Sequence, residues 1–231
     1  MNGTVIAVGG IDTGIGKTAV TGHLARHFAE AGLNVITQKI VQTGCEGVAE
    51  DVVEHRRIMG TQLLEDDFDG TTCPYVFRFP ASPHLAAALE GCSIDADAIR
   101  RSTSRLQQRY DLVLLEGVGG LLVPLTLTLL FADYVRDAGY GLVLVTTPRL
   151  GSINHTLLSL EACASRGIDV VGVIYNRFFN ADEIIASDTR EVIDAALKRY
   201  GFGSAPLVDL DAAGQWADPE ALNLILNPHS R

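Results

Sequence analysis

The sequence predicts an α/β fold in which a mostly parallel sheet lies between two layers of helices. Three observations support this prediction. The apolar, β-branched stretches are continuous rather than alternating, as in strands that are buried on both faces. Segments with helical periodicity separate these stretches, which is the pattern of βαβ units. No linker-like or low-complexity segment interrupts the chain, so we expect one domain over residues 1–231.

The individual elements follow from this pattern. Five segments have the composition of buried strands: Thr4–Val8, Val35–Gln38, Asp111–Leu115, Leu142–Thr147 and Val170–Tyr175. Seven segments have a helical pattern: Thr18–Ala31, Ala49–Met59, Pro83–Leu89, Asp95–Arg109, Phe131–Ala138, Ile153–Ser165 and Glu183–Arg199. Gly32 and Gly167 stand where two of these helices stop, and Ser82 with Pro83 opens another. We interpret Thr61–Phe79 as an irregular excursion, and the residues from Ala205 onward are only weakly patterned.

The composition limits the possible partners and the location. The formal net charge of −10 and the pI near 5.0 argue against nucleic acid or an anionic membrane as the main partner. No apolar run is long enough to span a bilayer and no targeting segment opens the chain, so we expect a cytoplasmic protein. Four cysteines without metal-ligand spacing predict reduced thiols. Any affinity for phosphate must therefore come from a local site.

A glycine-rich turn, Gly10-Ile-Asp-Thr-Gly-Ile-Gly-Lys-Thr18, lies between the first predicted strand and the first predicted helix. This is the context of a P-loop, in which backbone N–H groups surround phosphate oxygens, a lysine reaches the β- and γ-phosphates and a hydroxyl binds Mg²⁺. The fold class is therefore a P-loop NTPase-like, three-layer α/β/α fold. The alternative is a tight turn with an incidental lysine. The predicted ATP contacts in this turn are Asp12, Thr13, Gly14, Ile15, Gly16, Lys17 and Thr18.

The turn departs from the usual spacing. Five residues separate Gly10 from Gly16, whereas the usual motif has four, and Ile11 stands at the customary glycine position. We therefore interpret it as a variant P-loop.

Four later segments narrow the interpretation. They are Lys39-Ile-Val-Gln-Thr-Gly44, Ser82-Pro-His-Leu-Ala-Ala87, Glu116-Gly-Val-Gly-Gly-Leu-Leu-Val-Pro124 and Leu150-Gly-Ser-Ile-Asn-His-Thr-Leu-Leu158. With the variant loop, this set resembles the dethiobiotin synthetase family from the first strand to about Asn176. The resemblance implies that 7,8-diaminopelargonic acid, CO₂ and MgATP give dethiobiotin, ADP and phosphate. It also implies a homodimer with the substrate across the subunit interface.

Lys39 follows the second predicted strand, where an open sheet has its ligand crevice. The resemblance implies that Lys39 stabilises negative charge on the carbamate and on the transferred phosphoryl group, and that Thr43 hydrogen-bonds nearby. Lys17 and Thr13 of the P-loop complete the expected catalytic group. The alternative for Lys39 is a solvated lysine at a strand end.

Glu116 follows directly after the third predicted strand, where P-loop ATPases have a carboxylate near the metal. Asp51, at the start of a helix, is its candidate partner. Because Mg²⁺ prefers hard oxygen ligands, we expect Thr18, Asp51 and Glu116 to hold it. The alternative for Glu116 is a helix-capping or structural acid, and the alternative for Asp51 is a helix cap.

The resemblance also implies substrate contacts. Gly117, Val118 and Gly119 would let the backbone approach the substrate, although a simple tight turn is the alternative. Ser152 and Asn154 stand at a predicted helix start that could receive a substrate carboxylate bound mainly by the partner subunit, and plain N-capping is the alternative for both.

The resemblance implies that Asn176 contacts adenine, with a turn-forming asparagine as the alternative. The residues after it lack the Asn-Lys-x-Asp pattern of a guanine reader, so ATP is preferred over GTP. We interpret His84 and His155 as structural residues.

Two departures and two rivals accompany this hypothesis. Ile40 replaces the proline that usually follows the family's lysine, and Gly14 stands where some members carry glutamate. One rival is a nucleotide-switched partitioning or positioning ATPase, but such proteins have a lysine where this chain has Asp12. The other is an amidoligase of the cobyrinate type, which needs an additional glutaminase domain.

Overall fold

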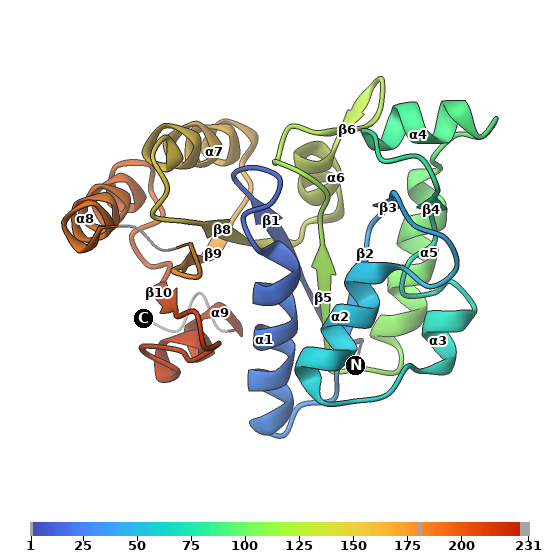
Figure 1. Cartoon of the computed structure of the whole chain (residues 1–231), viewed down its shortest axis with the longest axis horizontal. Coiled ribbons are helices and arrows are strands. Elements are labelled where there is room, and N and C mark those ends of the chain that lie inside the picture. Colours follow the sequence, from blue (N-terminus) through green and yellow to red (C-terminus); the bar gives the residue numbers. More distant parts are fainter. Residues whose placement is uncertain (1, 180–181, 227–231) are drawn as a thin grey trace.

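The computed structural model of the protein describes residues 2–179 and 182–226, and a parallel six-stranded sheet is its centre (Figure 1). The strand order is β10-β9-β8-β1-β5-β2. Each strand is parallel to its neighbours. The six strands are β1 (Thr4–Gly10), β2 (Val35–Lys39), β5 (Leu112–Glu116), β8 (Gly141–Thr146), β9 (Val170–Asn176) and β10 (Leu207–Leu210).

Two small sheets stand beside the main one. A parallel pair consists of β3 (Gln42–Thr43) and β4 (Val76–Phe77), and an antiparallel hairpin consists of β6 (Pro124–Thr126) and β7 (Leu129–Leu130). The longer helices are α1 (Lys17–Glu30), α2 (Glu50–Met59), α4 (Pro83–Leu89), α5 (Ala96–Gln107), α6 (Phe131–Ala138), α7 (Ser152–Arg166) and α8 (Glu183–Arg199). The short ones are α3 (Glu65–Phe68), the 3₁₀ helix η1 (Glu220–Leu222) and α9 (Asn223–Leu226).

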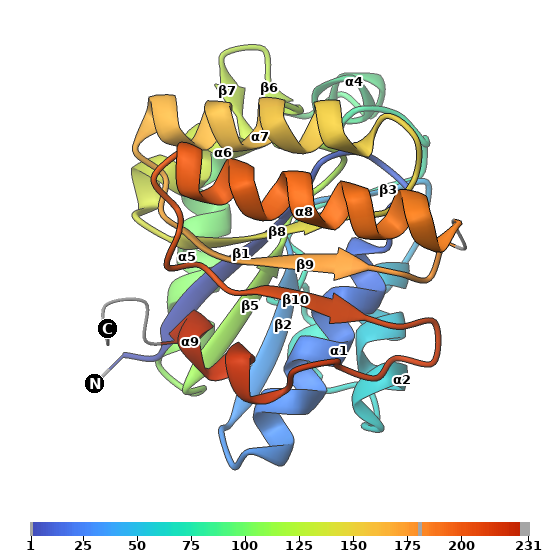
Figure 2. The ribbon, with the colours of Figure 1, turned by 90° about the vertical axis from the view of Figure 1, so that its left-hand side faces the viewer.

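Helices cover both faces of the main sheet, as Figure 2 shows. Helices α5, α6, α7 and α8 pack on one face, where strand residues such as Ala7, Val113 and Leu144 join their core. Helices α1 and α9 pack on the other face against Ile6, Leu114 and other strand residues that point the opposite way. Successive strand residues therefore enter different cores, which explains why the strands are continuously apolar. The predicted three-layer α/β/α class is confirmed.

The five predicted strands and seven predicted helices are present, and their ends differ from the predicted ones by two residues or fewer. The sixth strand, β10, was not predicted. It is only four residues long, lies at the sheet edge and alternates between half-buried and buried residues. The excursion Thr61–Phe79 contains the short elements α3 and β4, and the weakly patterned segment after Ala205 contains β10, η1 and α9.

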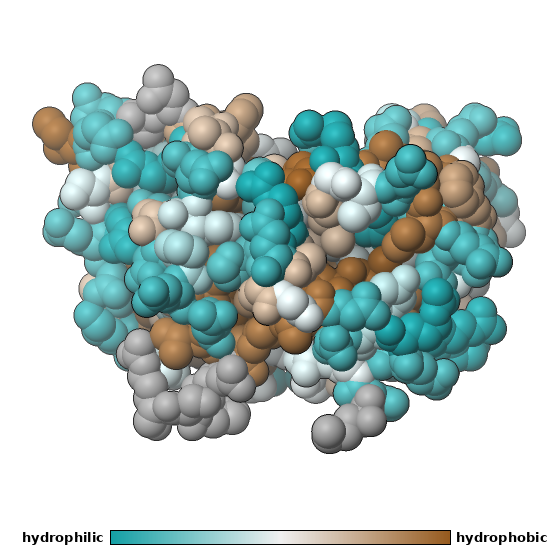
Figure 3. All heavy atoms as spheres, turned by 90° about the horizontal axis from the view of Figure 1, so that it is seen from below, coloured by the Kyte–Doolittle hydropathy of each residue, from teal (hydrophilic) through white to brown (hydrophobic). Residues whose placement is uncertain are grey.

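The sheet brings the predicted site residues together at the carboxyl ends of its central strands. β1 lies between β8 and β5, and the register of β5 places Glu116 beside Val8 of β1 and Lys39 of β2. A strand order that departs from chain order at β1 creates a crevice at this end of the sheet. Figure 3 shows the face at the bottom of Figure 1, where apolar residues form a band between hydrophilic ones.

None of the helices within residues 2–179 and 182–226 is both long and apolar enough to cross a membrane.

Candidate active site

The glycine-rich loop joins the end of β1 to the start of α1, as the sequence predicts. Gly16, the residue before α1, has φ +88°. A side chain disfavours this left-handed conformation, so a glycine belongs here. Lys17 is buried, and its Nζ donates a hydrogen bond of 2.7 Å to the carbonyl oxygen of Asp12. The lysine of the loop is therefore bound by the backbone of the same loop.

Thr18, the second residue of α1, contacts the other two predicted metal ligands. Its Oγ1 lies 3.1 Å from Oδ1 of Asp51 and 3.0 Å from Oε1 of Glu116. These three side chains come from α1, α2 and β5, which are far apart in the sequence. The predicted group of Thr18, Asp51 and Glu116 is thus assembled by the fold.

Lys39 lies between the same two carboxylates. Its Nζ is 2.5 Å from Oδ2 of Asp51, 2.8 Å from Oε1 of Glu116 and 2.9 Å from the carbonyl oxygen of Gly117. Only 4% of Lys39 is exposed. The alternative of a solvated lysine at a strand end is therefore wrong.

The alternatives of capping acids are also wrong for Asp51 and Glu116. Ala49 is the residue before α2, and no side chain caps this helix end. The carboxylate of Asp51 faces Thr18 and Lys39 instead. Glu116 is fully buried and is bound by Lys39, Thr18 and His55.

Burial and charge act together on the proton affinities in this cluster. Burial first, and then the charge of Lys39, lower the pKa of Lys17 to about 8, although the nearby acids oppose this shift. Burial also disfavours the charged form of Lys39, but Glu116 and Asp51 outweigh it and raise the pKa of Lys39 above 10.5. Burial opposes the carboxylate of Glu116, yet Lys39 and His55 lower the pKa of Glu116 to about 2. At neutral pH the buried cluster therefore contains an ammonium and an ionised carboxylate in direct contact.

A cavity of about 870 Å³ opens beside this cluster. Most of the predicted site residues line it: Thr13, Gly14, Gly16, Lys17, Thr18, Lys39, Thr43, Asp51, Glu116, Val118, Gly119 and Asn176. Five predicted residues, all within the described part of the chain, are not in its lining: Asp12, Ile15, Gly117, Ser152 and Asn154. The volume is that of a typical site for a small-molecule ligand or cofactor.

Asn176, at the end of β9, connects the glycine-rich loop to the segment that follows β9. Its Nδ2 donates to the carbonyl oxygen of Ile15 over 2.9 Å, and its Oδ1 accepts from the backbone N–H of Phe178 over 3.2 Å. A Cβ on Gly16 would lie 2.2 Å from the same Nδ2. The amide of Asn176 therefore occupies the space that a side chain at position 16 would need. Its contact with adenine stays a prediction.

The start of α7 does not have the side-chain N-cap that we gave as the alternative for Ser152 and Asn154. Gly151, with φ +91°, is the residue before the helix, and no side-chain hydrogen bond caps this end. Ser152 is buried, and its Oγ lies 3.0 Å from Oγ1 of Thr147. Asn154 is exposed. Ser152 is therefore not the helix cap, and the substrate contacts of both residues stay predictions.

Sequence reasoning missed several residues of this region. His55 is fully buried on α2, with its Nε2 2.7 Å from Oε2 of Glu116. It follows Asp51 by four residues, so the two share a helix face, and this spacing is a signal that could have found it. Other residues that line the cavity were also missed: His23, Arg26, Phe178, Phe179 and the loop 211–214. That loop follows the unpredicted strand β10.

Comparisons with known proteins agree with the family resemblance found in the sequence. A family profile described as an AAA domain matches residues 4–209. A Chlorobaculum tepidum protein named ATP-dependent dethiobiotin synthetase BioD is 72% identical over 228 residues, covering 99% of this chain and 95% of the relative. A Haemophilus influenzae protein named ATP-dependent dethiobiotin synthetase BioD 2 is 52% identical over 183 residues, covering 79% of this chain and 96% of the relative.

Solved structures show the fold. The MinC:MinD cell division protein complex of Aquifex aeolicus matches with a TM-score of 0.58 at 14% identity, covering 99% of this chain and 96% of that chain. A ParA family ATPase of Chlorobium tepidum matches with a TM-score of 0.53 at 15% identity, covering 99% and 93%. At these identities the likeness concerns the fold alone. The relatives that are similar in sequence decide the family: this chain belongs to the dethiobiotin synthetases.

Proposed function

We propose that this protein is an ATP-dependent dethiobiotin synthetase, which closes a cyclic urea on 7,8-diaminopelargonic acid with CO₂ and releases ADP and phosphate. The observation that carries the proposal is the position of Lys39. This buried ammonium lies beside the carboxylates of Asp51 and Glu116, next to the cavity that the phosphate loop lines. The family membership supplies the reaction, and the site contains groups that suit it.

The chemistry requires activation of a poor electrophile. A carbamate on one amine becomes reactive when ATP phosphorylates its oxygen, and the second amine then attacks the carbamate carbon and expels phosphate. Such a reaction depends mainly on positioning and on stabilising negative charge. Lys17 and Lys39 both line the cavity and suit this role, with Thr13 and Thr43 as neighbouring hydrogen-bond donors. Gly117, Val118 and Gly119 are the proposed backbone contacts of the substrate.

The donors of Thr18, Asp51 and Glu116 fit Mg²⁺. No group of three or more His, Cys, Asp or Glu residues that could hold a metal occurs among the described residues. Mg²⁺ does not need such a group, because one or two carboxylates together with phosphates and water complete its shell. The hydroxyl of Thr18 already touches both carboxylates. When bound there, Mg²⁺ would neutralise charge on the phosphates of ATP.

We extend the proposal to the glycine-rich loop and to Asn176. Asp12, Gly14, Ile15 and Gly16 are proposed to hold the phosphates with their backbone, and Asn176 is proposed to contact the base. The cytoplasm is the proposed location. Strands β1 and β10 belong to one sheet, which supports residues 1–231 acting as one domain.

A homodimer is part of the proposal. Four leucines on α4 and on or near the β6–β7 hairpin are exposed: Leu85 (45%), Leu89 (58%), Leu122 (51%) and Leu127 (86%). The two elements lie at the same end of the molecule in Figures 1 and 2. Exposed apolar side chains gathered in this way suit a protein interface. Ser152 and Asn154 are the proposed contacts for a substrate bound mainly by the partner. Sedimentation of Leu127→Glu tests the dimer, and an unchanged mass relative to the native protein would contradict this interface.

The reaction is tested by measuring ADP release with and without the diamine and bicarbonate. ADP release should require both, and dethiobiotin should form in equal amount. ATP turnover that does not depend on the diamine would contradict the proposal. Lys39→Ala should abolish most of the turnover, whereas Lys198→Ala, at an exposed position on α8, is the matched lysine control.

A further inference from the structure

His55 is a buried polar residue in the middle of a helix. It lies on α2 one turn after Asp51, and none of its surface is exposed. Its Nε2 is 2.7 Å from Oε2 of Glu116. An ionised carboxylate only accepts hydrogen bonds, so Nε2 carries the hydrogen of this contact. The other ring nitrogen, Nδ1, is buried and has no hydrogen-bond partner among the described residues.

The two oxygens of Glu116 have different partners. Oε1 receives hydrogen bonds from Lys39 at 2.8 Å and from Thr18 at 3.0 Å, and the contact of Oε2 is with His55. The terminal torsion of a glutamate is soft, so a carboxylate turns easily unless hydrogen bonds on both oxygens hold it. His55 supplies the bond on the side away from Thr18.

We propose that His55 is a positioning residue that orients Glu116, so that one carboxylate oxygen stays directed at Thr18 and Lys39. This inference rests on the proposed Mg²⁺ site and deepens it. A partner that hydrogen-bonds a carboxylate ligand from outside fixes its direction and raises metal affinity. The buried Nδ1, which has no partner among the described residues, agrees with this role, because an apolar residue at position 55 would avoid the free-energy cost of burying it.

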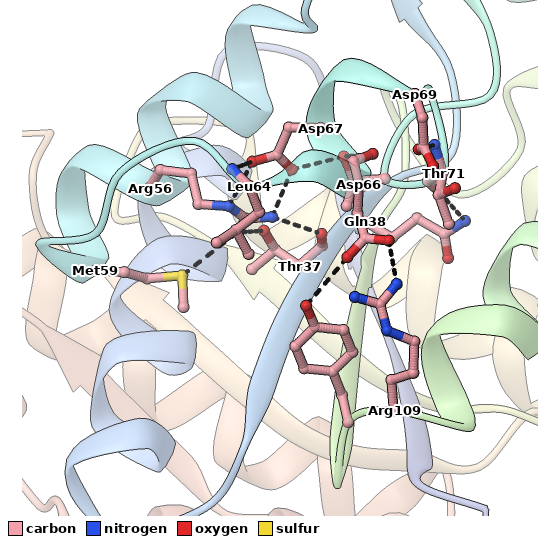
Figure 4. Close-up of polar contacts among 12 residues, drawn as sticks. Thr37, Gln38, Arg56, Met59, Leu64, Asp66, Asp67, Asp69, Thr71 and Arg109 are labelled. Atoms are coloured by element: carbon pink, nitrogen blue, oxygen red, sulfur yellow. Dashed lines mark hydrogen bonds and ion pairs between the residues drawn. The ribbon is translucent and has the colours of Figure 1, made fainter.

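The helix that carries His55 is itself fixed. The next residue, Arg56, points toward Asp67 and Thr37 (Figure 4). Its Nε and Nη2 lie 3.0 and 2.8 Å from the carboxylate oxygens of Asp67, and its Nη1 lies 2.8 Å from Oγ1 of Thr37. The buried guanidinium of Arg56 therefore holds α2 against β2. This contact fixes the position from which the imidazole of His55 binds Glu116.

The experiment measures metal affinity rather than turnover. Mn²⁺ is titrated into the full chain with ADP present and the diamine absent, and free Mn²⁺ is followed by electron paramagnetic resonance. His55→Leu removes the donor, whereas His55→Gln keeps an N–H near the position of Nε2. We expect His55→Leu to weaken Mn²⁺ binding by about 10- to 100-fold, and His55→Gln to recover most of it.

The control is His27→Leu, because His27 also has a buried nitrogen that finds no partner in the described part of the chain, but lies in the last turn of α1. His27→Leu should bind Mn²⁺ as the native protein does. Two results would overturn the inference: native affinity in His55→Leu, or equal weakening in His55→Gln and His55→Leu. Circular dichroism checks folding. If His55→Leu does not fold, His55→Asn replaces it, since its shorter amide does not reach the place of Nε2.

A further variant separates this inference from the proposed metal site. Glu116→Gln should lose most of the Mn²⁺ affinity if Glu116 is a ligand. Native affinity in Glu116→Gln would overturn the metal site itself. Weak binding in Glu116→Gln together with native binding in His55→Leu would overturn the role of His55 alone.

Discussion

Lys17 should make the stability of the nucleotide-free protein depend on pH in an unusual direction. Burial first, and then the charge of Lys39, lower the pKa of Lys17 from 10.5 to about 8 in the folded protein. In the unfolded chain the lysine regains its ordinary proton affinity. The folded state therefore binds fewer protons than the unfolded state between these two values, and stability must rise with pH across that interval.

The size of the effect follows from the two pKa values. Below pH 8 both states are protonated and the folded state carries the full penalty, about 3 kcal/mol at 1.36 kcal/mol for each pH unit. Above 10.5 both states are neutral and the penalty is gone. Between about pH 7 and about pH 9.5, the free energy of unfolding should gain roughly 2 kcal/mol from this lysine.

The assay compares the native protein with Lys17→Met. Both are unfolded in urea with EDTA and without nucleotide, at about pH 7 and about pH 9.5. The difference in unfolding free energy between the two proteins should shift by roughly 2 kcal/mol in favour of the native protein at the higher pH. Using this difference removes the contribution of groups that titrate in both proteins. It also removes the fixed effect of losing the hydrogen bond to Asp12.

Lys198→Met is the control, because Lys198 is 68% exposed on α8. Its difference from the native protein should stay the same at both pH values. A constant difference for Lys17→Met as well, or one that shifts in the other direction, would refute the reasoning from burial.

Three further outcomes are expected. Lys39→Met should lower the rate of dethiobiotin formation by at least about 100-fold because a charge-stabilising donor is lost, and a loss below about tenfold would contradict its catalytic role. Arg56→Met should lower the free energy of unfolding in urea by about 3 to 5 kcal/mol, since a buried carboxylate loses its partner. Arg57→Met, at the exposed neighbouring position, is its control, and equal losses would refute this. Gly16→Ala should weaken ADP binding by at least about tenfold, measured by titration calorimetry, because a Cβ there meets an amide at 2.2 Å. Gly91→Ala, with a similar backbone but open space around it, should bind ADP normally.

Much of the fold could be predicted because its strands are buried on both faces. Such strands are continuously apolar, and this pattern is visible without knowledge of their neighbours. β10 could not be found in this way, since an edge strand of four residues shows only half of the pattern. The loop 211–214, which follows β10 and lines the cavity, was therefore not predicted as part of the site.

Site residues that belong to sequence motifs could be predicted, whereas site residues that depend on packing between distant segments were missed. Lys39, Asp51 and Glu116 stand at strand or helix ends, and the fold brings both carboxylates within hydrogen-bond distance of Lys39. His55 and Arg56 lie inside a helix, where a polar side chain can face water or the core equally well. The deciding contacts are with Glu116 and Asp67, which are distant in the sequence. Their direction becomes known only when the sheet and the excursion after α2 are in place.

The burial of the two site lysines also decides how the protein behaves toward amine-reactive reagents. The sequence contains three lysines, Lys17, Lys39 and Lys198. The first two are 7% and 4% exposed, whereas the side chain of Lys198 is 68% exposed. Among the lysines, coupling to a surface or a dye through an amide bond should therefore take place at Lys198. A protein attached through that residue is held by α8, so an immobilised form can keep the phosphate loop and its cavity available to nucleotide.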